Sequence, residues 1–413
     1  MRKIILSVAV AAMALSTAAS ALEDIKVSGQ AKLWYETDNA GNTAANPGNL
    51  FNKTDSSGEI VFKLGMTGKQ GNVGFGATVY QSSSMGLEGN LINNYRTEVT
   101  NGDMFVGEAY VTAPMGAGTT LKLGKQELNT PFLFTETWNA LPNTFNAAVV
   151  TNKSVENLSL VGMYVGQDNS ASFKVNGNVN DQIFGGALVA GALYKNNAFD
   201  VNAWYTHISN AVGTTASTNA TGTNGIVEVS SPLGYTGGTV VNAYWVDAGT
   251  KVADINLRAY ATLFDVKANA DSTNAFALSA GTKVGDFDLF AAASTVSKDG
   301  GHNVANVSTG GKKSSLPTEG VYTDGVYVAQ NDSVAVKAKV STKVGSTGVA
   351  LQAVNNTNDS VAAKETTEVD LFLTDKFGDF STTAILMHRS FKDNATDDLS
   401  GGFYARFIVA LNF

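Results

Sequence analysis

Apolar and polar residues alternate with a period of two along much of this sequence, and the C-terminal segment 403–413 shows the pattern most clearly. Because successive side chains of a β-strand point to opposite faces, this segment is predicted to be a strand with one apolar and one mixed face. A last strand that is apolar on one face and ends in an aromatic residue is typical of a transmembrane β-barrel. The apolar face consists of Phe403, Ala405, Phe407, Val409, Leu411 and Phe413.

The same alternation recurs upstream in segments of about 8–14 residues, and no helical periodicity is sustained after residue 21. The apolar rows of these segments carry no charge. A lipid-facing surface requires this, because a cation at the middle of a bilayer costs about 2–4 kcal/mol. The clearest examples are 25–36, 60–66, 254–263, 334–340 and 368–374.

Tight and longer connections alternate between these segments, as in outer-membrane barrels with short periplasmic turns and long outer loops. The count predicts an all-β, antiparallel transmembrane barrel of about 18 strands with both termini periplasmic. Sixteen strands stay open as an alternative, as does a strand at 321–330 inside a long loop. A secreted β-sandwich also alternates, but it does not need short connections at one end only. Tight turns are expected at 68–72, 114–118, 155–157, 195–197, 248–251, 284–286, 345–347 and 376–379, and the longest loops near 209–237 and 298–332.

The N-terminus has the features of a secretory signal peptide. Met1, Arg2 and Lys3 form a short positive start, an apolar run covers 4–15, and small residues at 19–21 form a cleavage site. We therefore expect a signal peptide at 1–21 and a barrel domain at 22–413. A membrane anchor helix is the alternative, but the apolar run is too short to span a bilayer.

Composition narrows the class of protein further. Of 28 Lys and Arg, Arg2 and Lys3 lie in the signal peptide, which leaves 26 against 36 Asp and Glu, or about −10. So acidic a chain is an unsuitable partner for nucleic acid, which is itself negatively charged. In a pore, the same negative charge favours a weak preference for cations, because counter-ions concentrate near fixed charge. The absence of Cys in an exported chain suits a Gram-negative envelope protein that is stabilised by ladder hydrogen bonds and lipid burial.

The connection 128–146 is predicted to fold into the barrel and narrow it. It carries a single charge, Glu136, and it is too apolar for a loop in water. Two prolines stiffen it. Packing on a neighbouring subunit is the alternative. The residues assigned to this constriction are Pro131, Phe132, Phe134, Glu136, Trp138, Pro142 and Phe145.

Strand parity assigns the charged residues that line the pore, where rings of charge select ions. Lys122 and Glu108 flank the constriction and are the strongest candidates, while Arg389 lies in a segment of mixed parity. The other positive candidates are Lys32, Lys63, Arg258, Lys337, Lys339 and Arg406, and the other negative ones are Glu36, Glu59, Asp254, Asp288, Glu368 and Asp370. Phe403, Phe407 and Phe413 are assigned as the signal for the barrel-assembly machinery.

Metal and catalytic sites are not indicated. Asp393, Asp397 and Asp398 offer oxygen ligands for a loop-bound Ca²⁺, but without EF-hand spacing, and solvated charge is the simpler interpretation. His207, His302 and His388 are isolated and form no zinc motif. We expect no cofactor and no enzyme. A Ser–His site involving His207 stays an alternative, since triads are recognised by geometry; otherwise His207 is expected at the membrane interface with Trp204 and Tyr205.

Three segments carry a resemblance to a known family. The sequence LKLGKQELNTP at 121–131, LPNTF at 141–145 and VTNKSVENLSL at 150–160 resemble the major outer-membrane porins of campylobacteria and the wider OprD-like group. The resemblance implies an 18-stranded channel, trimeric in the campylobacterial branch and often monomeric in the OprD branch. OprD-like channels tend to use an arginine ladder, whereas this chain has only Arg96, Arg258, Arg389 and Arg406 after residue 21.

We therefore expect an outer-membrane porin, a water-filled channel for ions and small hydrophilic solutes. Its expected partners are outer-membrane lipid, the barrel-assembly machinery and two further copies of itself. A substrate-selective channel and a surface adhesin or structural barrel with a plugged lumen are the alternatives. Conductance, and its block by a particular solute, distinguish the three.

Overall fold

The chain is described as a computed structural model, and almost all of its regular structure is β-strand. Among the described residues, no helix is long and apolar enough to cross a membrane. The signal peptide predicted at 1–21 lies outside the described residues. Those residues are 22–39, 49–84, 86–92, 94–95, 104–137, 140–168, 183–211, 239–267, 271–300, 303–309, 313–359, 363–393 and 399–413.

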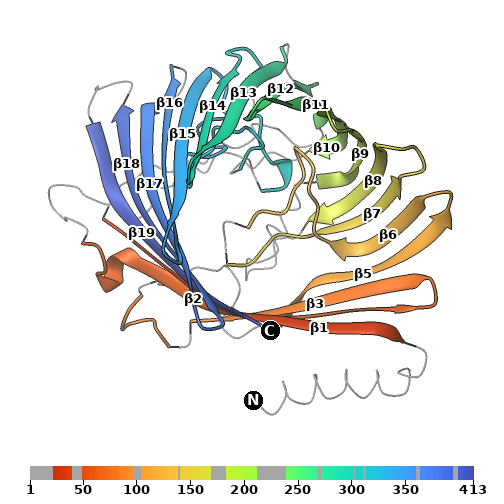
Figure 1. Ribbon diagram of the computed structural model, residues 1–413, viewed down its shortest axis with the longest axis horizontal. Coiled ribbons are helices and arrows are strands. Elements are labelled where there is room, and N and C mark those ends of the chain that lie inside the picture. Colours follow the sequence, from red (N-terminus) through yellow and green to blue (C-terminus); the bar gives the residue numbers. More distant parts are fainter. Residues whose placement is uncertain are drawn as a thin grey trace.

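Over these ranges, eighteen long strands form the wall of a closed barrel (Figure 1). The first nine are β1 (Glu23–Asp38), β2 (Ser56–Gln70), β3 (Val73–Ser83), β5 (Met104–Gly116), β6 (Thr119–Gln126), β7 (Phe145–Asn152), β8 (Leu158–Asp168), β9 (Ile183–Lys195) and β10 (Phe199–Ala211). The others are β11 (Thr239–Val252), β12 (Ile255–Val266), β13 (Thr273–Val284), β14 (Phe287–Val296), β15 (Ser333–Val344), β16 (Thr347–Asn358), β17 (Ala363–Phe377), β18 (Phe380–Asp393) and β19 (Leu399–Asn412). The short elements are β4 (Asn94–Tyr95), η1 (Lys53–Asp55) and η2 (Val307–Thr309).

Each wall strand pairs antiparallel with its neighbours in the chain, and β1 closes the ring against β19. The closing register runs from Gln30 opposite Asn412 to Asp38 opposite Tyr404. β4 is not part of this cycle, because it pairs in parallel with two residues of β2. The prediction of 18 strands is confirmed, and the 16-strand alternative is wrong.

Seven of the eight predicted tight turns join consecutive wall strands, and one is wrong. Residues 248–251 lie within β11, and the turn comes later, at Ala253 and Asp254. Gly249 lies in the strand opposite Arg258. The side chain of Arg258 crosses it, and a Cβ there would lie 2.7 Å from Nη2 of Arg258, so the glycine allows a close approach within the strand. The segment 321–330 consists of bends and turns and is no strand.

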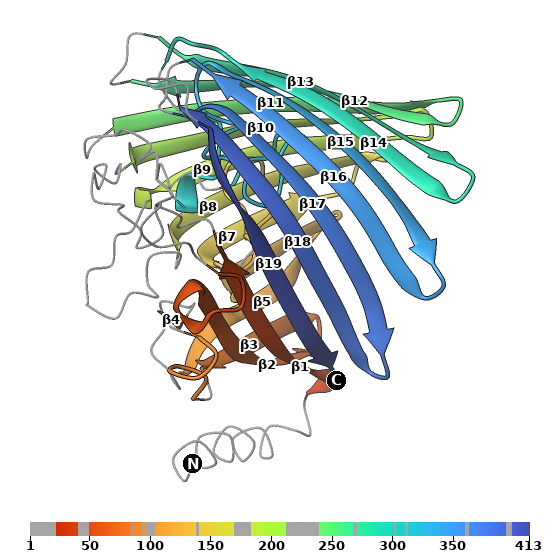
Figure 2. The same cartoon turned by 90° about the vertical axis from the view of Figure 1, so that its left-hand side faces the viewer.

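The outer surface of the barrel is apolar along the strands. On β13, for example, Phe276 and Leu278 expose 59% and 65% of their surface, while the alternating residues Ala275 and Ala277 face inwards and are buried. A sheet closed on itself has no unpaired edge, so such a surface is stable in lipid. The tight turns and the C-terminus lie at the same end of the barrel (Figure 2).

Two connections fold into the interior, seen inside the ring in Figure 1. We call residues 127–137 and 140–144, between β6 and β7, the first inner segment. We call residues 303–309 and 313–332, between β14 and β15, the second inner segment. Both bury apolar side chains against the inner wall and against each other. The core of this protein is therefore inside the barrel, on the side of β7 to β14 above all.

Candidate functional site: the interior of the barrel

The first inner segment packs against two separate parts of the wall. Phe132, 1% exposed, makes edge-on contacts with Trp245 and Phe264, at ring centroid distances of 6.0 and 5.5 Å. At its other end, Leu141 joins a buried cluster with Trp34 and Tyr80. The segment therefore crosses the interior from β11 and β12 to β1 and β3.

The remaining residues assigned to the constriction lie along the same path. Pro131 is buried, Phe134 and Pro142 are partly buried, and Phe145 is the fully buried first residue of β7. Glu136 is 6% exposed, and its backbone N–H donates to Oδ1 of Asn143 at 2.6 Å. Trp138 lies outside the described residues.

The second inner segment was not assigned to the interior from the sequence. Its burial is as deep as that of the first: Val304, Ala305 and Val307 are at most 1% exposed. An apolar loop was the reason for placing 128–146 inside the barrel, and the same reason applies here, because Leu316, Val321 and Tyr322 make this loop more apolar than an outer loop needs to be. These residues are hard to recognise in the sequence because the loop is long and rich in glycine.

Asn306 joins the two inner segments. Its side-chain nitrogen donates to the carbonyl oxygen of Phe134 at 2.8 Å and to Oε1 of Glu136 at 2.9 Å. Two more bonds support the junction: the backbone N–H of Val307 donates to the carbonyl oxygen of Phe132 at 2.9 Å, and Nδ2 of Asn143 donates to Oγ of Ser308 at 3.3 Å. The two segments thus form one hydrogen-bonded partition.

The second inner segment binds the wall on the opposite side through Glu368 of β17. The carboxylate of Glu368 accepts from three consecutive backbone N–H groups, those of Val321, Tyr322 and Thr323, at 2.5 to 3.1 Å. Such charge-assisted bonds to an otherwise unpaired stretch of backbone are stronger than neutral ones. Glu368 has no exposed surface, so this contact is sealed from the lumen water.

Tyr322 extends the contact to the closing strands. Its hydroxyl donates to Oε2 of Glu36 at 3.1 Å and accepts from Nη2 of Arg406 at 3.1 Å, and Arg406 also forms an ion pair with Glu36. The ring of Tyr322 lies 5.2 Å from the guanidinium of Arg406 and 5.2 Å from that of Arg389. Both guanidinium groups are thus within the range of cation–π attraction to this ring.

A cluster of partly buried charged side chains lies within the second inner segment itself. Nζ of Lys313 donates to the carbonyl oxygen of Val321 at 3.0 Å and lies 3.6 Å from Oδ2 of Asp324, while the backbone N–H of Ser314 donates to the Glu319 carboxylate. Burial raises the pKa of Glu319 to about 8, against the pull of Lys313, and raises the pKa of Asp324 to about 6. Burial opposes the charge on Lys313, but the nearby carboxylates of Glu319 and Asp324 raise the pKa of its ammonium.

The structure places the predicted pore-lining residues in two groups. Three of the positive candidates touch an inner segment: Lys32 donates to the carbonyl oxygen of Ala140 at 2.9 Å, Lys337 donates to that of Glu319 at 2.5 Å, and Arg406 contacts Tyr322. The other positive candidates contact the wall. Lys63, Lys122 and Lys339 lie over the rings of Tyr80, Tyr110 and Phe372, at 5.4, 3.7 and 5.4 Å, and Arg258 pairs with Asp200 and Asp247. The negative candidate Glu108 also contacts the wall, where it accepts from Thr78 at 3.1 Å.

The negative candidates are distributed in the same way. Glu36 and Glu368 hold the second inner segment, and Asp370 accepts from Nε2 of Gln352 at 2.7 Å beside it. Glu59 is buried on β2. Asp254 and Asp288 lie far from the inner segments, at the rim with the tight turns. Arg389, uncertain from sequence parity, faces inwards, where its Nη2 donates to the Tyr327 hydroxyl at 3.2 Å.

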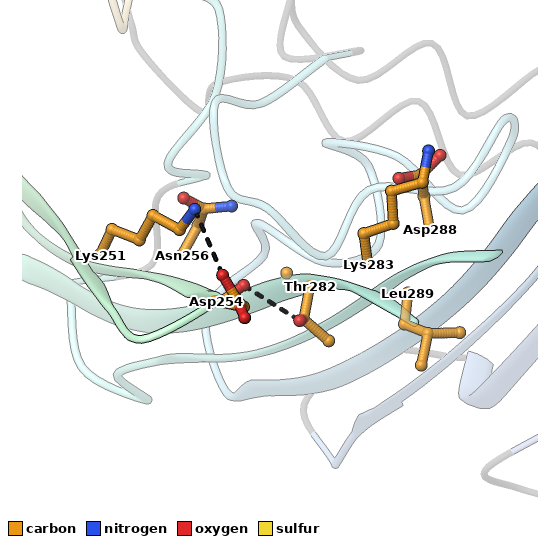
Figure 3. A pocket seen from close by; sticks show the side chains of 8 residues that line it. Lys251, Asp254, Asn256, Thr282, Lys283, Asp288 and Leu289 are labelled. Carbon is orange, nitrogen blue, oxygen red and sulfur yellow. Dashed lines mark hydrogen bonds and ion pairs between the residues drawn. The ribbon is translucent and has the colours of Figure 1, made fainter. Parts of the chain in front are cut away.

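A polar pocket of about 480 Å³ opens at that rim (Figure 3). On one side of it Lys251 and Asp254 form an ion pair of 3.7 Å, and the hydroxyl of Thr282 donates to the carbonyl oxygen of Asp254. Lys283 and Asp288 line its other side. The pocket thus brings two cations and two anions together, without an excess of either sign.

The assigned assembly residues face outwards on the closing strand. Phe403 and Phe413 are more than half exposed, and the backbone of Phe413 exchanges two hydrogen bonds with Gly29 of β1. Phe407 lies against Tyr35 and Phe51, at 6.3 and 6.1 Å. Together these aromatic rings cover the seam where the barrel closes.

The histidines and acidic loop residues form no evident site in the described structure. His207 bonds to Oδ1 of Asn242 on the outer face beside Tyr205, but the prediction for Trp204 was wrong, because its ring packs against the inner apolar cluster. Among the described residues, no group of three or more His, Asp or Glu is placed to hold a metal ion. His302, Asp397 and Asp398 lie outside the described residues, and Asp393 ends β18.

The closed wall and the two inner segments define the class of fold: a membrane-spanning antiparallel barrel whose interior is partly occupied by two of its own connections. No family model matches this sequence, and no curated protein matches it.

Solved structures with this fold include the outer membrane protein OpdK of Pseudomonas aeruginosa, with a TM-score of 0.66 at 14% identity over 94% of this chain and 99% of that one. Another is OccAB3 of Acinetobacter baumannii, with a TM-score of 0.65 at 12% identity over 94% and 99%. OpdK has also been solved with vanillate. At such low identity the likeness establishes the fold.

Proposed function

We propose that this protein is an outer-membrane porin, which lets ions and small hydrophilic solutes diffuse through a water-filled channel. The observation that carries this proposal is the combination of an apolar outer surface with an inner wall that bears charged side chains, among them Lys63, Lys122 and Lys339. Charges inside a barrel that spans lipid serve no packing purpose, but they hydrate a path for solutes. The partition formed by the inner segments is the proposed constriction.

Finer features of the proposal rest on the sequence. They are a signal peptide at 1–21, periplasmic termini, assembly through Phe403, Phe407 and Phe413, and a homotrimer of the campylobacterial type. The OprD-like resemblance agrees with the fold of the similar structures. Weak cation preference is proposed from the net charge of the chain.

Recording from the purified protein in a planar bilayer tests the proposal. We expect stepwise conductance with open dwell times, and a reversal potential in a salt gradient shifted modestly toward the cation value. Protein denatured by heat before addition is the control. If folded protein gives no conductance steps, the porin function is contradicted and a plugged structural barrel is favoured. If the reversal potential shifts toward the anion value, only the cation preference is contradicted.

A substrate-selective channel is the second candidate, favoured by the lysines that lie over aromatic rings. Such pairs offer a positive charge beside an apolar face, which suits a small aromatic carboxylate. OpdK, which has this fold, was solved with vanillate. Vanillate added at millimolar concentration should then reduce the ionic current in a saturable manner, while a current that stays unchanged favours unselective diffusion.

A further inference from the structure

We propose that the second inner segment is a pH-dependent gate, which stays bound to the wall in acid and is released from it as the pH rises above neutrality. The inference rests on the proposed channel function and adds a form of regulation to it. Three features of the described structure carry it: the few places at which the segment is held, the buried carboxylates in it, and the charged groups that surround them.

The segment is held at a small number of polar contacts rather than by continuous pairing. Glu368 binds three of its backbone N–H groups, Tyr322 binds Glu36 and Arg406, and Thr318 shares a 2.6 Å hydrogen bond with Ser294 of β14. All of these contacts fall between residues 318 and 323. Lys337 also donates to the carbonyl oxygen of Glu319, Ser315 donates to that of Pro131, and Leu316 is buried in the inner core. Residues 313–324 therefore meet their surroundings at a few defined polar contacts beside one buried leucine.

Glu319 lies within this range and is partly enclosed. The charged groups that face it are Lys313 and Asp324 from its own segment, Glu136 from the first inner segment, and Lys337 from β15. Two lysines thus face two other carboxylates. A negative charge on Glu319 is unfavourable there chiefly because burial removes it from water, and the two neighbouring carboxylates add to this cost.

The sign of the effect follows from this enclosure. Released into lumen water, Glu319 would have the ordinary carboxyl pKa of 4.5, whereas in the bound segment its pKa is about 8. The bound state holds its proton more tightly, so its advantage is complete below pH 4.5 and is lost as the pH rises through 8. Over this window the ratio of released to bound segment rises by up to about tenfold per pH unit. Asp324, with Lys313, Arg389 and Glu368 around it, acts in the same direction up to a pKa of about 6.

Single-channel recording at pH 6.5 and pH 8.5 tests the gate, because Asp324, with a pKa of about 6, is largely ionised at both pH values and the remaining response belongs to Glu319. We expect a larger or more frequently enlarged conductance at pH 8.5 in the wild-type protein. Glu319→Gln, which keeps the acceptor oxygen for Ser314 but cannot ionise, should show the acid conductance at both pH values. Asp286→Asn, which removes a carboxylate in the exposed turn before β14, is the matched control and should respond like wild type.

A covalent lock supplies the second test. The chain has no Cys, so the double variant Ser294→Cys/Thr318→Cys forms at most one disulfide, at the place where the two hydroxyls now touch. Oxidised protein should keep the acid conductance at pH 8.5, and reduction should restore the pH response. Equal conductance of the wild type at both pH values overturns the gate, as does a pH response that survives in Glu319→Gln or in the oxidised double variant.

A readout without current separates the gate from the channel function. In the single variant Thr318→Cys, the thiol is buried while the segment is bound, and a membrane-impermeant maleimide should label it faster at pH 8.5. Comparison with Thr318→Cys/Glu319→Gln at the same pH cancels the ionisation of the thiol itself. Faster labelling only where Glu319 is present supports the gate even if no current is seen, a result that would contradict the porin function alone. Equal labelling of the two variants overturns the gate.

Discussion

Asn306 is a single side chain on which the partition inside the barrel depends. It has no exposed surface, and its amide bonds to Phe134 and Glu136 across the junction of the inner segments. In Asn306→Ala, the Glu136 carboxylate loses one partner, and the carbonyl of Phe134 keeps only its 3.2 Å bond from Nδ2 of Asn143, at a total cost of about 1–3 kcal/mol. We expect the wall to stay folded while conductance steps become larger and noisier, as recorded in planar bilayers.

The matched control is Asn152→Ala, which removes hydrogen bonds of 3.1 and 2.7 Å to Ala117 and Thr119 at a tight turn. It deletes the same chemical group far from the inner segments and should leave the conductance of each step unchanged. Similar conductance changes in both variants would argue that any weakened barrel conducts more, and would remove Asn306 from the proposed constriction.

The sequence predicted which face of the wall each strand side chain points to, but it did not predict what that side chain binds. Alternation placed Lys32, Glu368 and Arg406 on the inner face from the sequence, because a strand has a period of two. What each one binds depends on segments far away in the chain. Glu368 meets the backbone of residues 321–323, and backbone N–H groups in a loop leave no pattern in a sequence.

At the scale of elements, the two inner segments differ in how clearly the sequence marks them. The first concentrates aromatic residues, two prolines and a single charge in a short stretch. The second spreads its apolar residues among Gly, Ser and Thr and therefore resembles an outer loop. The turn predicted at 248–251 was wrong for a related reason: this range contains Gly249, and a glycine on which a side chain packs cannot be told in the sequence from a glycine that turns the chain.

Phe132 tests whether the first inner segment is fixed to the wall by packing. Phe132→Ala removes the ring from its contacts with Trp245 and Phe264, a loss of about 3–5 kcal/mol for a buried phenylalanine. We expect larger conductance steps and a change in tryptophan fluorescence, since Trp245 loses its neighbour. Phe287→Ala, on the half-exposed outer face, is the control, and a similar rise in its conductance would contradict the assignment of Phe132.

The barrel has an apolar outer surface and a charged inner wall, and this difference between the two faces was the most predictable property of the chain. Each strand contributes to it independently, so an error in one turn, as at 248–251, leaves the strand number and the outer surface intact. The number of strands follows from the alternation of short and long connections. The interior does not repeat in this way, because two irregular connections fill it, and their path is set by contacts among β1, β11, β12 and β17 that no local pattern contains.

The apolar outer face predicts a depth-dependent cost for charge. Leu278 lies in the middle of β13 and is 65% exposed, while Val284 ends the same strand and is 58% exposed. If lipid covers this surface, Leu278→Lys should destabilise the folded barrel by about 2–4 kcal/mol and Val284→Lys by about 0–1 kcal/mol, because a lysine at the strand end reaches the interface. Denaturant unfolding in phospholipid bilayers, followed by tryptophan fluorescence, measures both. In water the two equally exposed positions would tolerate lysine equally well, so equal and small effects would mean that no membrane surrounds the barrel.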